Sequence, residues 1–141
     1  MVVRTSTAEW HGRVQDGGGC VSLGSGAFEG PYSFGSRFEE EPGTNPEELI
    51  AAAHASCFSM ALSAQLGSAN LTPESINTTA NLKMEKLEAG WAITTIHLDV
   101  RAKVPGSDEA TFQKLAENAK SGCPVSKVLN AKISMNAVLE P

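Results

Sequence analysis

The sequence is short of charge. Charged residues make up 19% of its 141 positions, whereas about 25% is typical of globular domains. The 16 acidic residues outnumber the 11 basic ones, which leaves a formal net charge of −5. Because no basic run occurs, we expect neither nucleic acid nor an anionic membrane surface as a partner. The deficit also indicates that part of the surface is covered, as a second copy of the chain would cover it.

Long apolar runs and metal-binding patterns are also missing. The segment from Met1 to Trp10 has no apolar core of the kind a secretory signal needs, and no stretch approaches the ~20 apolar residues of a membrane span. We therefore expect a cytoplasmic protein. Three cysteines without a CxxC spacing fit neither a disulfide framework nor a zinc ribbon. The three histidines, His11, His54 and His97, are scattered, so we expect no metal and no other cofactor.

The length is that of one domain, and it suffices to bury a core without disulfide or metal staples. A hydrophobic fraction of 41% excludes a disordered chain. We predict a single domain over residues 1–141, with no internal repeat.

The first forty residues are predicted to form strands separated by glycine-rich turns. Alternation at Ala8 and Trp10, a turn at glycines 17–19 and renewed alternation from Cys20 to Leu23 indicate a hairpin. Most of the few aromatic residues follow in one short segment that ends at Phe38. The glycines between 24 and 30 lack the spacing of a dinucleotide loop and open no helix.

The strongest helix signal begins at Asn45. This residue can cap a helix with Pro46 at its first position and two glutamates in its first turn. Apolar residues then recur at helical spacing to Leu66, and Gly67 supplies a stop. Since no charged residue lies between the first turn and Gly67, we predict a central helix of about 21 residues that is buried nearly all round.

The remainder of the chain returns to a period of two. A long hairpin is predicted over residues 76–104, with its turn at 88–90. A helix capped by Ser107 or Asp108 then ends at Gly122, and Cys123 is placed to cap a further helix that begins at Pro124. A last strand alternates over 131–139. This order predicts an α+β fold with antiparallel sheet.

Two cysteines lie where a thiol can be reactive. Cys57 is on the apolar stripe of the central helix, where the alternative is a small packing residue. Cys123 is at a helix N-terminus, where free N–H groups and the helix dipole stabilise a thiolate. Cys20 suggests no partner, and we assign it no role. His54 stands one turn before Cys57, which leaves open a Cys–His hydrolase or acyl transferase beside a structural histidine.

Two cysteine motifs resemble the osmotically inducible protein C (OsmC) and organic hydroperoxide resistance family, and lie closest to its OsmC branch. They are TNPEELIAAAHASCFSMAL over residues 44–62 and SGCPVSKVL over residues 121–129. The resemblance extends over the whole chain and includes Trp10-His-Gly and Tyr32-x-Phe34-x-x-Arg37-Phe38. It implies antiparallel sheets wrapped around a long buried central helix, in an intertwined dimer.

The resemblance implies a cysteine-based peroxidase of the oxidative stress response, which reduces organic hydroperoxides to alcohols. By motif, Cys57 is the peroxidatic thiol, Cys123 the resolving thiol, and Arg37 and Glu47 the polar pair beside them. Glu47 is preferred to Glu48 because the family's acid directly follows the proline of Asn-Pro-Glu. The resemblance also implies recycling of the Cys57–Cys123 disulfide by a dihydrolipoyl-carrying protein or another dithiol reductant.

Substrate binding and helix geometry lead to two more predictions. An alkyl tail needs an apolar wall, for which the candidates are Phe28, Phe34, Phe38, Phe58 and Met60. On one continuous helix, Glu47 and Cys57 are ~15 Å apart along the axis, too far for a compact site within one chain. We therefore predict a homodimer with two interfacial sites, in which the partner supplies at least part of the Arg37 and Glu47 side.

Two interpretations of another kind stay open. One is a permanent Cys57–Cys123 staple, which a cytoplasmic chain of this size neither needs nor easily keeps. The other is a non-catalytic module that binds a hydrophobic ligand in an aromatic-lined cleft.

Overall fold

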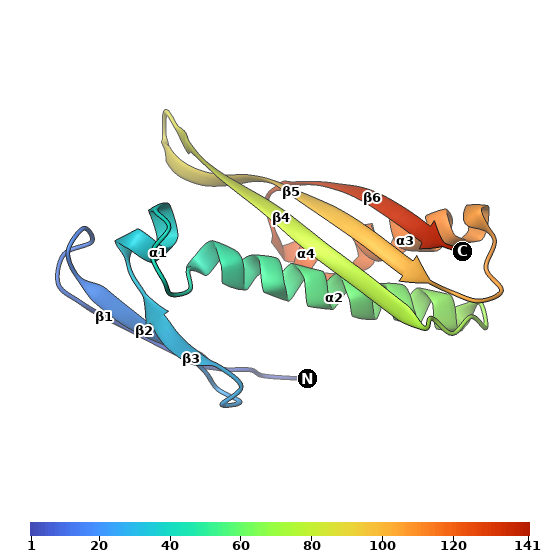
Figure 1. Cartoon of the computed structure of the whole chain (residues 1–141), viewed down its shortest axis with the longest axis horizontal. Helices are drawn as coiled ribbons and strands as arrows, with labels where there is room; N and C mark the ends of the chain where they lie inside the picture. Colours follow the sequence, from blue (N-terminus) through green and yellow to red (C-terminus); the bar gives the residue numbers. More distant parts are fainter. The chain divides into compact units, whose positions relative to one another are not determined.

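A computed structural model describes all 141 residues. The chain divides into two compact units, Met1–Leu49 and Ile50–Pro141 (Figure 1). A compact unit is not by itself an independently folding domain. The prediction of a single domain over 1–141 therefore stays a prediction.

The first unit contains a three-stranded antiparallel sheet, in the order β1-β2-β3. Its strands are β1 (Ser6–His11), β2 (Gly18–Leu23) and β3 (Glu29–Tyr32). The predicted hairpin is present, but its turn precedes residue 18, because Gly18 and Gly19 already pair with β1. A Cβ atom at Gly19 would lie 2.6 Å from the Tyr32 ring and 2.9 Å from the Trp10 ring. This glycine therefore makes room for two aromatic side chains that cross the sheet.

A short helix, α1 (Phe34–Phe38), follows β3 and was not predicted. Its N-terminus is a capping box in which Ser33 and Ser36 each bond the other's backbone N–H, at 3.1 and 2.8 Å. Ser36 is buried, and its hydroxyl also donates to the Thr44 carbonyl oxygen at 2.7 Å. The serine pair fixes α1 beside the residues that lead into the next helix.

The long helix α2 (Pro46–Ser68) begins where the sequence predicts. The Asn45 side chain accepts a hydrogen bond from the Glu48 backbone N–H at 2.7 Å, which satisfies one of the free donors at this helix end. The helix continues through Gly67 to Ser68 and is 23 residues long. It is one continuous element that runs from the first unit into the second (Figure 1).

Burial of α2 differs from the prediction of a helix buried nearly all round. Only one stripe is buried, with a spacing of four residues, and it consists of His54, Phe58, Leu62 and Leu66. The other side is exposed and carries small residues, mainly alanine and serine, together with Met60. The physical reason is that the sheet of one chain covers only one side of a helix. A second uncharged face is left without a partner.

By length and composition alone, α2 could cross a membrane. The prediction that no stretch approaches the length of a membrane span is therefore wrong for residues 46–68. Core helices of soluble proteins meet the same criteria, so this finding is weak evidence for a membrane. The absence of a membrane partner stays a prediction.

The second unit contains a sheet in the order β4-β5-β6. The predicted hairpin is confirmed as antiparallel β4 (Ser75–Leu87) and β5 (Gly90–Lys103). The last strand, β6 (Lys132–Glu140), pairs parallel to β5, so the expectation of purely antiparallel sheets is wrong here. Helices α3 (Glu109–Gly122) and α4 (Pro124–Val128) fill the connection between them. Such a crossover returns the chain to the end of the sheet where β5 began.

The core of the second unit lies between the sheet, α2 and α3. Every second residue of β5 is buried from Ile96 to Ala102, as its alternation predicts. The buried stripe of α2 and the α3 side chains of Phe112 and Ala116 complete this cluster. The fold is α+β, with α2 packed against the sheet of the second unit.

Candidate functional site

Two thiols meet in the second unit. Cys57 lies on α2 and is partly exposed, whereas Cys123 is fully buried and is the N-cap residue of α4, as predicted. The thiol of Cys123 donates to the Cys57 sulfur at an Sγ–Sγ distance of 2.7 Å, and both cysteines are free. Residues 66 positions apart are thus close enough to form a disulfide with a small side-chain movement.

Within one chain, the surroundings of Cys57 favour the neutral thiol over the thiolate. Burial and the contact with Cys123 raise the pKa of the Cys57 thiol, while a hydrogen bond from the Val125 backbone N–H lowers it. No cationic side chain contributes to this shift. The thiol pair alone is therefore arranged for disulfide chemistry but lacks the positive charge that activates a thiol.

His54 lies one turn before Cys57 and makes a different contact from the one a hydrolase needs. It is completely buried, and its Nε2 atom is 2.7 Å from the Ser126 hydroxyl of α4. Its Nδ1 atom has no hydrogen-bond partner, and burial lowers the pKa of the imidazole. Neither ring nitrogen bonds Cys57, so the Cys–His dyad of the hydrolase or transferase alternative is not formed.

The polar pair named by the resemblance lies in the first unit. Arg37 of α1 donates two hydrogen bonds to the Glu47 carboxylate of α2, from Nε at 2.8 Å and from Nη2 at 2.9 Å. The ion pair is therefore bidentate. The Glu47 side chain is only 13% exposed, against 38% for Arg37. The hydrogen bond to Glu47 raises the pKa of Arg37, so the guanidinium keeps its charge.

The two glutamates at the start of α2 have separate tasks. Glu48 takes part in the N-terminal cap of α2. Its backbone N–H donates to the Asn45 side chain, and its carboxylate accepts a hydrogen bond from the Thr44 hydroxyl at 2.8 Å. Glu47 instead binds Arg37. The Arg37 partner is thus Glu47 and not Glu48, and the role of Glu47 in a reaction stays a prediction.

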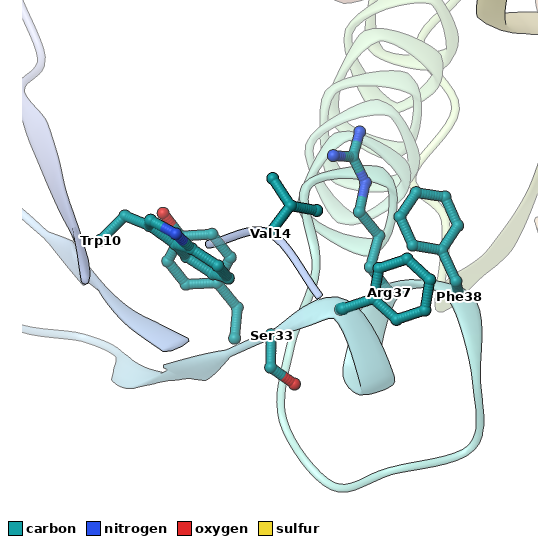
Figure 2. A pocket seen from close by; sticks show the side chains of 7 residues that line it. Trp10, Val14, Ser33, Arg37 and Phe38 are labelled. Atoms are coloured by element: carbon teal, nitrogen blue, oxygen red, sulfur yellow. The ribbon is translucent and has the colours of Figure 1, made fainter. Parts of the chain in front are cut away.

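An aromatic cavity of about 230 Å³ lies beside Arg37 in the first unit. Figure 2 shows Trp10 on one side, Arg37 and Phe38 on the other, and Val14 between them. Two ring pairs form its walls, Trp10 with Tyr32 at a centroid distance of 5.3 Å and Phe34 with Phe38 at 4.9 Å. The lining consists of Trp10, Val14, Tyr32, Ser33, Phe34, Arg37 and Phe38.

Comparison with known proteins places this arrangement in a family. The model of the OsmC-like protein family matches residues 38–137. Peroxiredoxin OsmC of Escherichia coli is 53% identical over 134 residues, which cover 94% of each chain. The chain belongs to the OsmC-like protein family.

Further relatives of this OsmC-like chain extend the comparison. An organic hydroperoxide resistance protein of Xanthomonas axonopodis is 32% identical over 98 residues, which cover 69% of this chain and 67% of that protein. An OsmC-like protein of unknown function from Vibrio cholerae has the same fold, with a TM-score of 0.80 at 15% identity over 98% of this chain and 100% of that one. The names of the relatives support a peroxidase-type redox role.

The five residues predicted to bind the organic group of the substrate do not lie together in this OsmC-like chain. Phe34 and Phe38 line the aromatic cavity, but Phe28, 40% exposed, is not part of its lining. Phe58 is wholly buried in the core of the second unit, and Met60 is 76% exposed on α2. Their substrate-binding roles stay predictions.

Three apolar lining residues of the cavity, Trp10, Val14 and Tyr32, were missed as candidates. Trp10 and Tyr32 are both in the motifs that carry the resemblance, and both pack where Gly19 lacks a side chain. That glycine, opposite an aromatic residue on the neighbouring strand, is the signal that could have found them. Val14 lies in a turn and gives no such signal.

Proposed function

We propose that this chain is a thiol-dependent peroxidase that reduces organic hydroperoxides to alcohols. The observation that carries the proposal is the contact between Cys57 and Cys123, whose sulfurs are 2.7 Å apart. The activities named for the relatives point to the same chemistry. A non-catalytic module that binds a hydrophobic ligand would account for the aromatic cavity but not for the contact between the two thiols.

The reaction has two steps on the protein. The Cys57 thiolate attacks the terminal peroxide oxygen, the O–O bond breaks, and the departing alkoxide takes a proton to become the alcohol. Cys57 is left as a sulfenic acid. The Cys123 sulfur then attacks it, which forms the Cys57–Cys123 disulfide and releases water. A dithiol such as a dihydrolipoyl group on a carrier protein returns two electrons, and the cytoplasm is the compartment that keeps such dithiols reduced.

Thiolate formation is the part that the thiol pair does not supply. At an ordinary thiol pKa of ~8.5, only about 3% is ionised at pH 7. Lowering the pKa by about 1.5 units takes roughly 2 kcal/mol of differential stabilisation. Because burial raises the pKa of Cys57, a nearby cation is needed. Our candidate for this cation is Arg37, which Glu47 holds in place through two hydrogen bonds. The N–H groups of its guanidinium can also donate hydrogen bonds to the peroxide and to the departing alkoxide.

We further propose that two copies of the chain complete each other's sites. Since α2 is continuous, Glu47 lies ~15 Å from Cys57 along its axis. The exposed face of α2 has no charge from Leu49 to Asn70, which suits burial against a second copy. In the dimer, the partner's Arg37 and the partner's Glu47 act on Cys57. The aromatic cavity beside Arg37 then receives the organic group of the hydroperoxide.

We expect the chain to sediment as a dimer. At micromolar concentration, analytical ultracentrifugation should give a mass of about twice the chain's 14.8 kDa. Covering the uncharged face of α2 is the physical reason. A mass near that of a single chain would contradict the shared site, though not the thiol chemistry itself.

The two-step reaction predicts distinct products for the intact chain and for Cys123→Ser. Reduced protein treated with one equivalent of cumene hydroperoxide should form the Cys57–Cys123 disulfide and one equivalent of cumyl alcohol, as read by mass spectrometry. Without the Cys123 sulfur, Cys57 should stop at the sulfenic acid, and a second equivalent of the peroxide should oxidise it further to the sulfinic acid. A Cys123→Ser chain that shows neither product would contradict the assignment of Cys57 as the attacking thiol.

A further inference from the structure

Two side-chain contacts align α2 with α4. The first joins the thiols of Cys57 and Cys123, and the second joins His54 and Ser126 at 2.7 Å. His54 lies three residues before Cys57, and Ser126 lies three residues after Cys123. The contacts are therefore one helical turn apart along both segments, and they hold α4 beside α2 in an antiparallel sense.

The His54–Ser126 hydrogen bond is a polar contact in an otherwise apolar part of the core. Both residues are buried, and the other positions of the stripe are Phe58, Leu62 and Leu66. The Nδ1 atom of His54 has no hydrogen-bond partner, and an orphaned buried nitrogen destabilises the fold. An apolar side chain would avoid this loss. The contact therefore calls for a reason other than stability.

The small size of α4 supplies that reason. The helix has five residues, and the Cys123 side chain makes no capping hydrogen bond. A helix this short holds its position only through outside contacts. Yet two groups at the N-terminus of α4 contact Cys57. One is the sulfur of the N-cap residue Cys123, and the other is the Val125 backbone N–H in the first turn. A slide or rotation of α4 by even about 1 Å would weaken both contacts.

We propose that the His54–Ser126 hydrogen bond is a positioning contact that keeps the Cys123 sulfur and the Val125 N–H against Cys57. His54 and Ser126 act through α4 and do not touch the peroxide. The importance of this contact for turnover rests on the proposed peroxidase function. Its effect on the proximity of the two thiols does not, and can be measured without any peroxide.

The measurable quantity is the effective concentration of one thiol at the other. Equilibration with dithiothreitol reports it: two protein thiols and oxidised dithiothreitol exchange two electrons and two protons to give the Cys57–Cys123 disulfide and reduced dithiothreitol. A Cys20→Ser background removes the third thiol, which is exposed and outside the contact. Acid quenching and mass spectrometry give the fraction of disulfide.

We expect Ser126→Ala to lower the effective concentration about tenfold. His54→Gln should keep it within about threefold of the starting protein, because the glutamine amide can donate to Ser126 from a position near that of Nε2. The control is Thr78→Val, which removes a hydroxyl bonded to Ser59 of α2 at 2.8 Å but leaves α4 alone. It should change the effective concentration less than about twofold.

The double variant His54→Leu with Ser126→Ala separates positioning from stability. Replacing both partners of a buried hydrogen bond by apolar groups is often nearly neutral for stability. We therefore expect its thermal unfolding to be close to that of the starting protein while its effective concentration stays low. An unchanged effective concentration in Ser126→Ala, or an equal loss in Thr78→Val, would overturn the proposal. So would full recovery in the double variant; if it does not fold, Ser126→Ala and Thr78→Val decide.

Discussion

The Cys57→Ser chain is expected to lose organic hydroperoxide reduction by at least about a thousandfold. A serine hydroxyl is essentially un-ionised near neutral pH and does not attack the peroxide oxygen. Of the two thiols that remain, Cys123 is fully buried and Cys20 lies outside the thiol pair. Consumption of cumene hydroperoxide, with dihydrolipoamide as the reductant, is the measurement. A stopped assay that counts the alcohol formed excludes slow uncatalysed loss of the peroxide.

Cys20→Ser is the matched control for this loss. Cys20 is exposed on β2, and its nearest polar contacts are to Val21 and Glu29 of the first unit, so its replacement should leave the rate unchanged. If Cys57→Ser retains the starting rate, the peroxidase proposal fails. The dithiothreitol equilibrium could still show that His54 and Ser126 position the thiol pair.

Mixing two inactive variants is expected to restore activity if the sites are shared between chains. Arg37→Met should lower the rate by about a hundredfold, because it removes the cation that stabilises thiolate and leaving alkoxide. A mixed dimer of Arg37→Met and Cys57→Ser holds one site with intact thiols and the partner's Arg37. Random pairing makes about half of the dimers mixed, and one of their two sites is complete, so about a quarter of the starting activity should return.

The control for this experiment is a mixture of Cys57→Ser with Cys123→Ser. Both changes fall in the same thiol pair, so no mixed dimer gains a complete one, and the mixture should be no more active than the mean of the two variants measured separately. Chains must exchange for the test to work, which refolding the two variants together ensures. If the Arg37→Met and Cys57→Ser mixture stays inactive although mixed dimers are shown by mass, the partner does not supply Arg37.

Local signals in the sequence predict the helix starts well. Asn45 with Pro46, Asp108, and Cys123 with Pro124 all lie at helix N-termini in the structure, because a cap depends on a few adjacent residues. The short α1 was missed although Ser33 and Ser36 form a capping box. Aromatic and glycine residues there favour a strand or a turn, and tertiary contacts of Ser36 override that preference.

Features that depend on distant residues were not predictable in the same way. The parallel pairing of β6 follows from where the α3–α4 crossover delivers the chain, and periodicity does not encode strand direction. Likewise, the uncharged faces of α2 indicate burial but not which side one chain's own sheet covers. For the candidate site, the residue types and family motifs predicted Cys57 and Cys123, whose sulfurs the structure brings together. The Ser126 contact of His54 joins residues 72 apart and left no local signal.

The place of Cys123 in the crossover has a consequence for the newly made chain. Cys57 emerges 66 residues earlier, and the residues between the two cysteines form β4, β5 and α3 of the native structure. Closing so long a loop is slow and relies on contacts formed beforehand. We therefore expect the dithiol to assemble late in folding. A nascent or locally unfolded chain carries the two thiols apart, so the favoured closure of the Cys57–Cys123 disulfide arises only with the native structure.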